Sequence, residues 1–214
     1  MDHNTHKLTL EKAKWFYSFL GNMVIDSAKE LDWLYLIKKK ISKNQKDISD
    51  ILSLHMHVLY LLMDISVLYR MYVAAQIPHE ERFAIKQLNV IMIEGFKRLF
   101  GFGKGSRDSL FHMVSPQNNQ ITATDIEGYN QIKEVVTKFG SDNNLDKRAR
   151  DISVHYDVDV NEVYTMLINI NAEETTKNLI ECLAVFKKFT GYIRKVEKPY
   201  LERFFCASSH PNNR

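Results

Sequence analysis

The sequence contains little glycine, proline or cysteine, and these scarcities narrow the class of protein. Its 214 residues include 8 Gly, 4 Pro and 2 Cys. Long segments therefore lack helix-breaking residues. The two cysteines, Cys182 and Cys206, form neither a disulfide framework nor a metal-binding spacing. Reduced thiols in a cytoplasmic protein are the simplest interpretation.

Long hydrophobic runs and a strong charge of one sign are also missing. The most apolar stretch, VLYLLMDISVLYRMYVAA, is interrupted by Asp64 and Arg70, so we expect no membrane span. The first ten residues are polar, unlike a signal peptide. A net charge of +3 permits a nucleic-acid partner without arguing for one. With 45% hydrophobic residues, the chain can form one sizeable core, so we expect a single cytoplasmic domain spanning residues 1–214.

Helical periodicity dominates the chain, and no stretch alternates convincingly like a strand. Residues 10–41 predict one kinked helix or two. A helix capped by Asp47 or Ser49 follows and runs to Ala75. Further helices are predicted over 79–100 and 125–139, from about 143 to 157, after Asp159, and from Ala172 toward Phe205. The sequence thus predicts an all-α bundle of five or six main helices, with a hinge and linker at 101–124.

Several residues invite a functional reading but have simpler explanations. His55 and His57 are two positions apart, so on a helix they cannot share a metal, and we expect partly exposed helix histidines. GFGKGS lacks the spacing of a phosphate loop and is expected to be a connector. The lysines from Lys38 to Lys46 are expected to be a solvated helix end, with phosphate contact as the alternative. Trp15 and Trp33 are expected in the core.

One pattern, R-D-x-x-x-H, occurs twice. The early frame comprises Arg107, Asp108 and His112, and the late frame comprises Arg150, Asp151 and His155. Arginine and histidine suit phosphodiester chemistry, because a guanidinium matches the oxygens of a phosphate and an imidazole exchanges protons near neutral pH. However, an Arg–His pair at loose spacing should occur about once by chance at this composition.

Helix geometry constrains how the late frame can work. Positions i and i+5 lie about 140° apart, so Arg150 and His155 do not sit side by side on one helix, whereas Asp151 and His155 do. The long side chain of Arg150 must therefore extend around the helix to His155, or the two residues must meet at an interface with a second subunit. The plainer alternative is that Arg150 and Asp151 are exposed helix charges and that His155 caps a helix or bonds within the core.

The segment RARDISVHYDVDVNEVYTML resembles the signature of the HEPN superfamily, small all-α domains of bacterial toxin–antitoxin and phage-defence systems. In that signature an arginine and a polar residue precede a histidine, as Arg150, Asp151 and His155 do. One toxin subgroup carries a tyrosine two places after the histidine, as a target for nucleotidylation by its antitoxin. Here that position is Asp157 and the tyrosine is Tyr156, which argues against this modification.

The resemblance implies a fold, an activity and partners. The fold would be a helical bundle that dimerises and lines a shared cleft with its motifs. The activity would be metal-independent RNA cleavage without a cofactor, leaving a 2′,3′-cyclic phosphate. His155 would transfer protons, Arg150 would stabilise the transition state and Asp151 would orient His155. Lys147, Arg148 and Tyr156 are the candidates for RNA contact, and an antitoxin or another defence protein is the candidate partner.

Sequence context favours the late frame over the early one. The early frame follows a glycine-rich break, and Leu110, Phe111 and Met113 beside it are expected to anchor the segment in the core. Two alternatives stay open. One is a catalytically silent HEPN-like module that binds RNA or a protein, and the other is an unrelated helical interaction protein.

Overall fold

The computed structural model describes residues 10–101, 109–142, 161, 165, 168, 169 and 171–208. Every regular element in these ranges is helical, so the predicted all-α class is confirmed. The elements are α1 (Leu10–Lys40), α2 (Lys46–Ala74), α3 (Pro78–Phe100), α4 (Leu110–Met113), the 3-10 helix η2 (Thr122–Asp125), α5 (Ile126–Asp142) and α8 (Ala172–Ser208).

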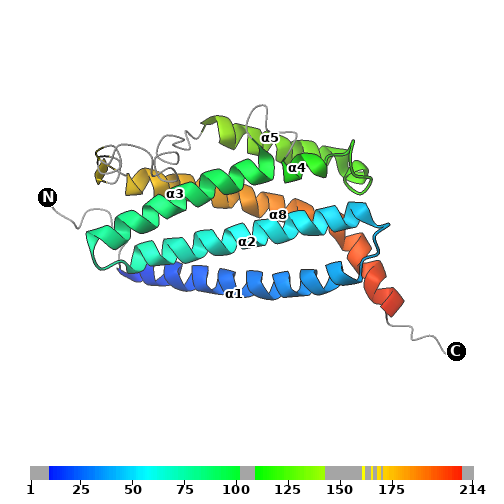
Figure 1. Cartoon of the computed structure of the whole chain (residues 1–214), viewed down its shortest axis with the longest axis horizontal. Coiled ribbons are helices and arrows are strands. Elements are labelled where there is room, and N and C mark those ends of the chain that lie inside the picture. The colour runs from blue at the N-terminus through cyan, green and yellow to red at the C-terminus, as the bar shows by residue number, and fades with distance from the viewer. Residues whose placement is uncertain are drawn as a thin grey trace.

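Helix α2 lies at the centre of the bundle (Figure 1). It packs against α1 on one side and α3 on the other, and α8 crosses behind α2 and α3. The short α4 and the longer α5 run along the far side of α3, where α5 also contacts α8. Each helix turns an apolar stripe to these neighbours, and together the stripes form one hydrophobic core.

Helix α2 is more apolar than expected from the sequence. By length and composition alone it is long and apolar enough to cross a membrane, a property that the buried core helix of a bundle shares. Its place in the bundle accounts for the apolarity, because half of its most apolar window is buried against the rest of the protein. Leu52, Val58 and Ile65 are fully buried there.

Helix α1 is one continuous helix, which decides between the two alternatives for residues 10–41. Its aromatic residues differ from expectation. Trp15 is 66% exposed and Trp33 is 38% exposed, so placing them in the core was wrong. Trp15 stacks on Phe19, which is also exposed, with ring centroids 5.4 Å apart. The helix buries a different stripe that includes Leu20 and Leu34, because only one of its faces has α2 as a partner.

The helix ends follow local sequence signals. Pro78 begins α3, where its missing N–H costs nothing. Gly101 ends that helix with φ of 74° and donates its N–H to the carbonyl of Lys97, a conformation that favours glycine. Asn171 caps α8, since its Oδ1 accepts the N–H of Glu174 at 3.0 Å.

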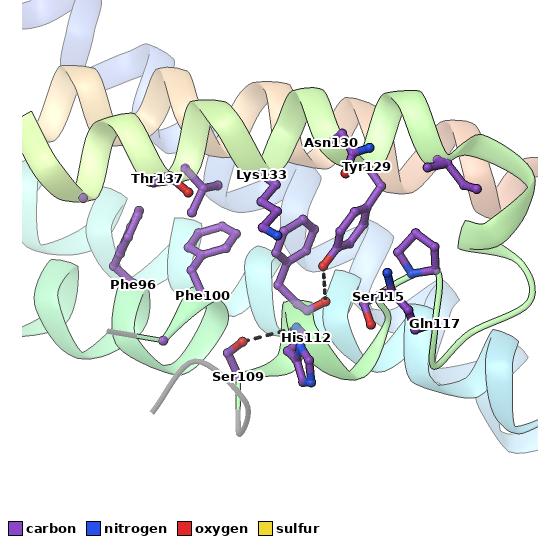
Figure 2. A pocket seen from close by; sticks show the side chains of 16 residues that line it. Phe96, Phe100, Ser109, His112, Ser115, Gln117, Tyr129, Asn130, Lys133 and Thr137 are labelled. Atoms are coloured by element: carbon purple, nitrogen blue, oxygen red, sulfur yellow. Dashed lines mark hydrogen bonds between the residues drawn. The ribbon is translucent and has the colours of Figure 1, made fainter. Parts of the chain in front are cut away.

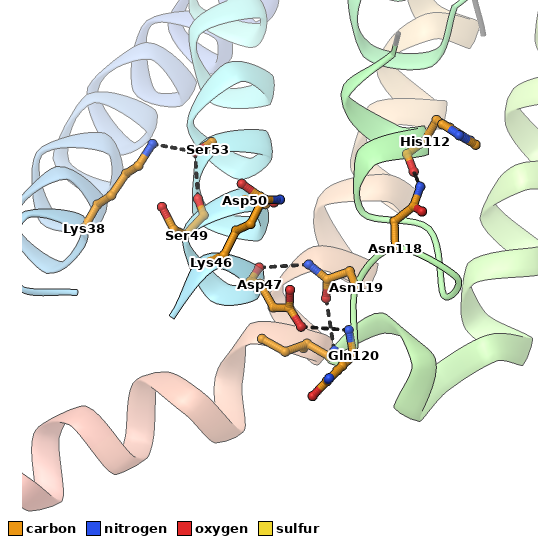
Figure 3. Close-up of polar contacts among 11 residues, drawn as sticks. Lys38, Lys46, Asp47, Ser49, Asp50, Ser53, His112, Asn118, Asn119 and Gln120 are labelled. Atoms are coloured by element: carbon orange, nitrogen blue, oxygen red, sulfur yellow. Dashed lines mark hydrogen bonds and ion pairs between the residues drawn. The ribbon is translucent and has the colours of Figure 1, made fainter. Parts of the chain in front are cut away.

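The described part of the expected hinge and linker, from Ser109 onward, is fastened to α2 (Figure 3). Asn119 donates to the carbonyl of Asp47 at 2.9 Å, and the N–H of Gln120 donates to the Asp47 carboxylate at 2.9 Å. Asp47 therefore holds the linker. The expectation that Asp47 or Ser49 caps α2 was wrong, because Gln45 occupies the cap position. These bonds fix α4 and η2 against the bundle, and so define the setting of His112.

An ion pair between Asp125, the last residue of η2, and Lys195 joins η2 to α8. Their Oδ2 and Nζ atoms lie 2.7 Å apart. Hydrogen bonding by Lys195 lowers the pKa of Asp125 below its usual 3.8. A carboxyl whose folded-state pKa is lowered stabilises the fold above its unfolded-state pKa, and this stabilisation disappears as the pH falls through the folded-state value.

We therefore expect Asp125→Asn to destabilise the protein more at pH 6 than at pH 3. Urea unfolding at the two pH values measures the difference. Asp32→Asn is the control, because Asp32 is exposed and lies on α1, away from this pair. If Asp125→Asn lowers the free energy of unfolding by the same amount at pH 6 and pH 3, the ion pair contributes nothing to stability.

Candidate functional site

Most of the residues predicted to form the site lie outside the described part of the chain. These are Arg150, Asp151 and His155 of the late frame, the RNA-contact candidates Lys147, Arg148 and Tyr156, and Arg107 and Asp108 of the early frame. The late frame falls in the sequence between α5 and α8. Of the predicted site residues, the structure places only His112.

His112 lies on the rim of a pocket of about 720 Å³ between the end of α3, α4 and α5 (Figure 2). We call it the His112 pocket; it is lined by Phe100, His112, Ser115, Tyr129 and Lys133, among others. Gly101 and Ser109, the described residues that flank 102–108 in the sequence, both line it as well.

Local hydrogen bonds hold His112 in place. The Ser109 hydroxyl accepts the N–H of His112 at 3.2 Å and so caps α4. The side chain of Asn118 donates to the His112 carbonyl at 3.0 Å. Leu110 and Phe111 are buried as expected, whereas Met113 is 43% exposed and does not anchor the segment. The imidazole ring of His112 is exposed and has no partner in the described residues.

Aromatic rings form the floor of the pocket. Phe111 and Tyr129 stack with centroids 4.4 Å apart and planes 17° apart, and Phe100 meets Phe111 edge-on at 5.7 Å. The Tyr129 hydroxyl donates to the Phe111 carbonyl at 3.3 Å. Burial raises the pKa of Tyr129 to about 12, so this hydroxyl stays protonated at neutral pH.

Polar groups surround this floor and carry no negative charge. Lys133 extends from α5 into the pocket, opposite His112 on α4 (Figure 2). It is exposed and has no ion pair with any described residue. No Asp or Glu of the described ranges lines the pocket. The hydroxyl of Ser115 is buried and has no hydrogen-bond partner within the described ranges. The electrostatics of the pocket therefore suit an anion or a ligand rich in acceptors.

A second polar cluster, centred on His55, lies inside the bundle. His55 is 0% exposed, so the prediction of a partly exposed histidine was wrong for it; His57 is exposed. The His55 Nδ1 atom lies 3.0 Å from Oε1 of the buried Glu197, and its Nε2 atom lies 3.6 Å from Glu30. Arg194 in turn donates to Glu30 at 2.9 Å. The cluster ties α1, α2 and α8 together.

Neither a metal cluster nor a reactive thiol is found among the side chains that the structure describes. No set of three His, Cys, Asp or Glu side chains suited to a metal ion occurs within the described ranges. Cys182 is buried, and burial raises the pKa of its thiol well above the usual value, so it does not ionise at neutral pH. Of the described side chains, those of the His112 pocket are the best placed to meet a ligand.

No known protein family matches this chain. No curated protein and no solved structure matches it either.

Sequence reasoning found one residue of this pocket and missed the rest. His112 stood out because it belongs to a repeated frame. Lys133 and Ser115 belong to no motif. Ser115 follows α4 and lies three residues after His112, whereas Lys133 joins the lining of the pocket only because α5 folds back over it. A weak signal did exist for Lys133, since α5 carries a polar side next to its buried Ile132 and Val136, but a polar helix face is usually only solvated.

Proposed function

We propose that this chain is a HEPN-like, metal-independent endoribonuclease. The observation that carries the proposal is the late R-D-x-x-x-H frame, Arg150, Asp151 and His155, between two helices of an all-α protein. The residue types supply what RNA cleavage needs when the 2′-hydroxyl is the nucleophile, because the substrate then brings its own attacking oxygen.

The proposed reaction uses one histidine and one arginine. His155 serves in proton transfer, either from the attacking 2′-hydroxyl or to the departing 5′-oxygen. The bond from the 2′-oxygen to phosphorus forms as the bond to the 5′-oxygen breaks. Arg150 stabilises the charge on the five-coordinate phosphorus, and Asp151 orients His155. The products are a 2′,3′-cyclic phosphate and a free 5′-hydroxyl.

A homodimer would let Arg150 of one subunit meet His155 of the other, which removes the geometric difficulty of their spacing. An antitoxin or another defence protein is the proposed regulator. In the described structure, the His112 pocket supports an RNA-facing role, because it offers Lys133 and His112 and no carboxylate. His112 itself belongs to the early frame, which we assign to RNA binding in preference to the reaction.

One observation favours the catalytically silent alternative. Helix α1 exposes Trp15, Phe19 and Trp33, and exposed aromatic residues are enriched at protein interfaces. A silent module that binds another protein through α1 would explain them without any chemistry.

RNA cleavage in EDTA separates the two functions. We expect the full-length chain to cut a labelled single-stranded RNA in the presence of EDTA, and the new ends to carry cyclic phosphate, which mass spectrometry of the fragments detects. An all-deoxy strand of the same sequence is the control, and it should stay intact because it lacks the 2′-hydroxyl. Intact RNA throughout would favour the silent module, and cutting of the deoxy strand would exclude the proposed mechanism.

A further inference from the structure

Two polar side chains of the His112 pocket, those of Lys133 and His112, have no acceptor among the described residues. Lys133 carries a permanent positive charge without an ion-pair partner in the described structure, and the ring of His112 is free. Glu127 and Glu134, the acidic residues nearest to Lys133 on α5, do not line this pocket. The described lining thus contains positive charge and hydrogen-bonding groups, with no carboxylate of the described residues among them, and an anionic group would complete it.

The hydroxyl of Ser115 gives independent evidence that a ligand enters. It is 3% exposed, lines the pocket and lacks a hydrogen-bond partner among the residues that the structure describes. A buried polar atom without a partner costs free energy, so such atoms are rare in folded proteins and call for an explanation. A ligand oxygen or nitrogen in the pocket would supply the missing bond.

The aromatic floor of the pocket favours a ligand that is larger than a small anion. Phe100, Phe111 and Tyr129 present an aromatic surface, and the volume of about 720 Å³ lies in the usual range for small-molecule sites. A phosphate alone would leave this surface uncovered, and a purely apolar ligand would leave Lys133 and Ser115 without partners. A flat, aromatic base joined to a phosphate satisfies both parts.

We propose that the His112 pocket binds a nucleoside monophosphate, with its phosphate at Lys133 and His112 and its base over the Phe111–Tyr129 stack. The nucleotide is either free or one residue of an RNA strand. The second source rests on the proposed ribonuclease function, and the first does not. Asn130 and Gln117, two exposed amides on the rim, are placed to bond the edge of the base.

Calorimetric titration of the full-length chain with adenosine 5′-monophosphate tests the pocket. We expect saturable binding, and binding of adenosine alone or inorganic phosphate alone that is at least about tenfold weaker. Lys133→Gln should weaken monophosphate binding by about 10-fold or more, since it removes a charge-assisted bond. Thr137→Trp, from the exposed side of α5, should fill the pocket and also weaken binding.

Lys188→Gln is the matched control, because Lys188 is an exposed lysine on α8 that lines no part of the pocket. It should bind the monophosphate within about twofold of the wild type. Absence of saturable binding by the wild type would overturn the proposal. So would unchanged binding in both Lys133→Gln and Thr137→Trp, with circular dichroism confirming that the variants are folded.

Competition with RNA identifies the source of the nucleotide. If the monophosphate displaces a labelled RNA from the His155→Ala chain, and Lys133→Gln weakens both, the pocket holds one residue of the RNA. If Lys133→Gln weakens only the monophosphate, the ligand is a free nucleotide. If the chain binds the monophosphate but does not cleave RNA, the nucleotide-binding proposal stands and the ribonuclease proposal fails. If it cleaves RNA but does not bind the monophosphate, the ribonuclease proposal stands and the nucleotide-binding proposal fails.

Discussion

Replacing Glu197 with leucine will lower the free energy of unfolding by about 3 kcal/mol. Glu197 is 3% exposed and lies 3.0 Å from Nδ1 of the fully buried His55. Its removal leaves a buried imidazole nitrogen without its partner, and such a loss is far larger than that of a surface ion pair. Urea unfolding followed by circular dichroism measures the change.

The double variant His55→Leu/Glu197→Leu should recover much of this loss. Replacing both partners of a buried polar pair by apolar side chains leaves no atom unsatisfied, and is often close to neutral. Glu202→Leu is the control on the same helix, because Glu202 is exposed and only pairs loosely with Lys198, at 3.8 Å. We expect it to change stability by less than about 1 kcal/mol. If Glu197→Leu and Glu202→Leu lower the free energy of unfolding equally, the buried pair stabilises the protein no more than a surface ion pair does.

Helices and their ends could be predicted from the sequence because their causes are local. Pro78 begins α3 and Asn171 caps α8, in agreement with the signals at those positions. The boundary of α5 was less accurate, since the helix continues past Gly140 to Asp142. Glycine costs a helix only about 1 kcal/mol, and Phe139 is buried in the core just before it. Packing can therefore outweigh a single unfavourable residue.

The failures arise where the structure depends on distant partners. Periodicity shows that Trp15 and Phe19 share a side of α1, but not whether another helix covers that side. In the same way, His55 and Glu197 are separated by 142 residues, so no pattern in either segment reveals their contact. The burial of His55 follows from the crossing of α8 behind α2, which is a property of the whole bundle.

The candidate site contains residues that the sequence predicts and residues that only the fold brings together. A repeated frame pointed to His112, and the structure then placed it beside Lys133 and Ser115, which no motif had marked. The late frame stays a prediction, because its residues lie outside the described part of the chain. The two frames share the same pattern, so the pattern cannot distinguish their roles. Substituting the two histidines one at a time can.

His155→Ala should lower the single-turnover rate of RNA cleavage by about 10² to 10⁴, the usual contribution of a general acid or base. His112→Ala should act differently, because His112 lies on the rim of a binding pocket. We expect it to raise the RNA concentration needed for half-maximal cleavage and to leave the rate at saturating RNA nearly unchanged, as for a contact made equally in the ground and transition states.

His57→Ala serves as the histidine control for this pair. His57 is exposed on α2, bonds only to the Ser53 carbonyl at 2.9 Å, and lines no part of the His112 pocket. It should cleave RNA like the wild type. If His112→Ala instead abolishes the saturated rate while His155→Ala retains it, the early frame is the reaction centre. Because His112 lines the same pocket as Lys133, the phosphate undergoing attack would then lie at the pocket itself.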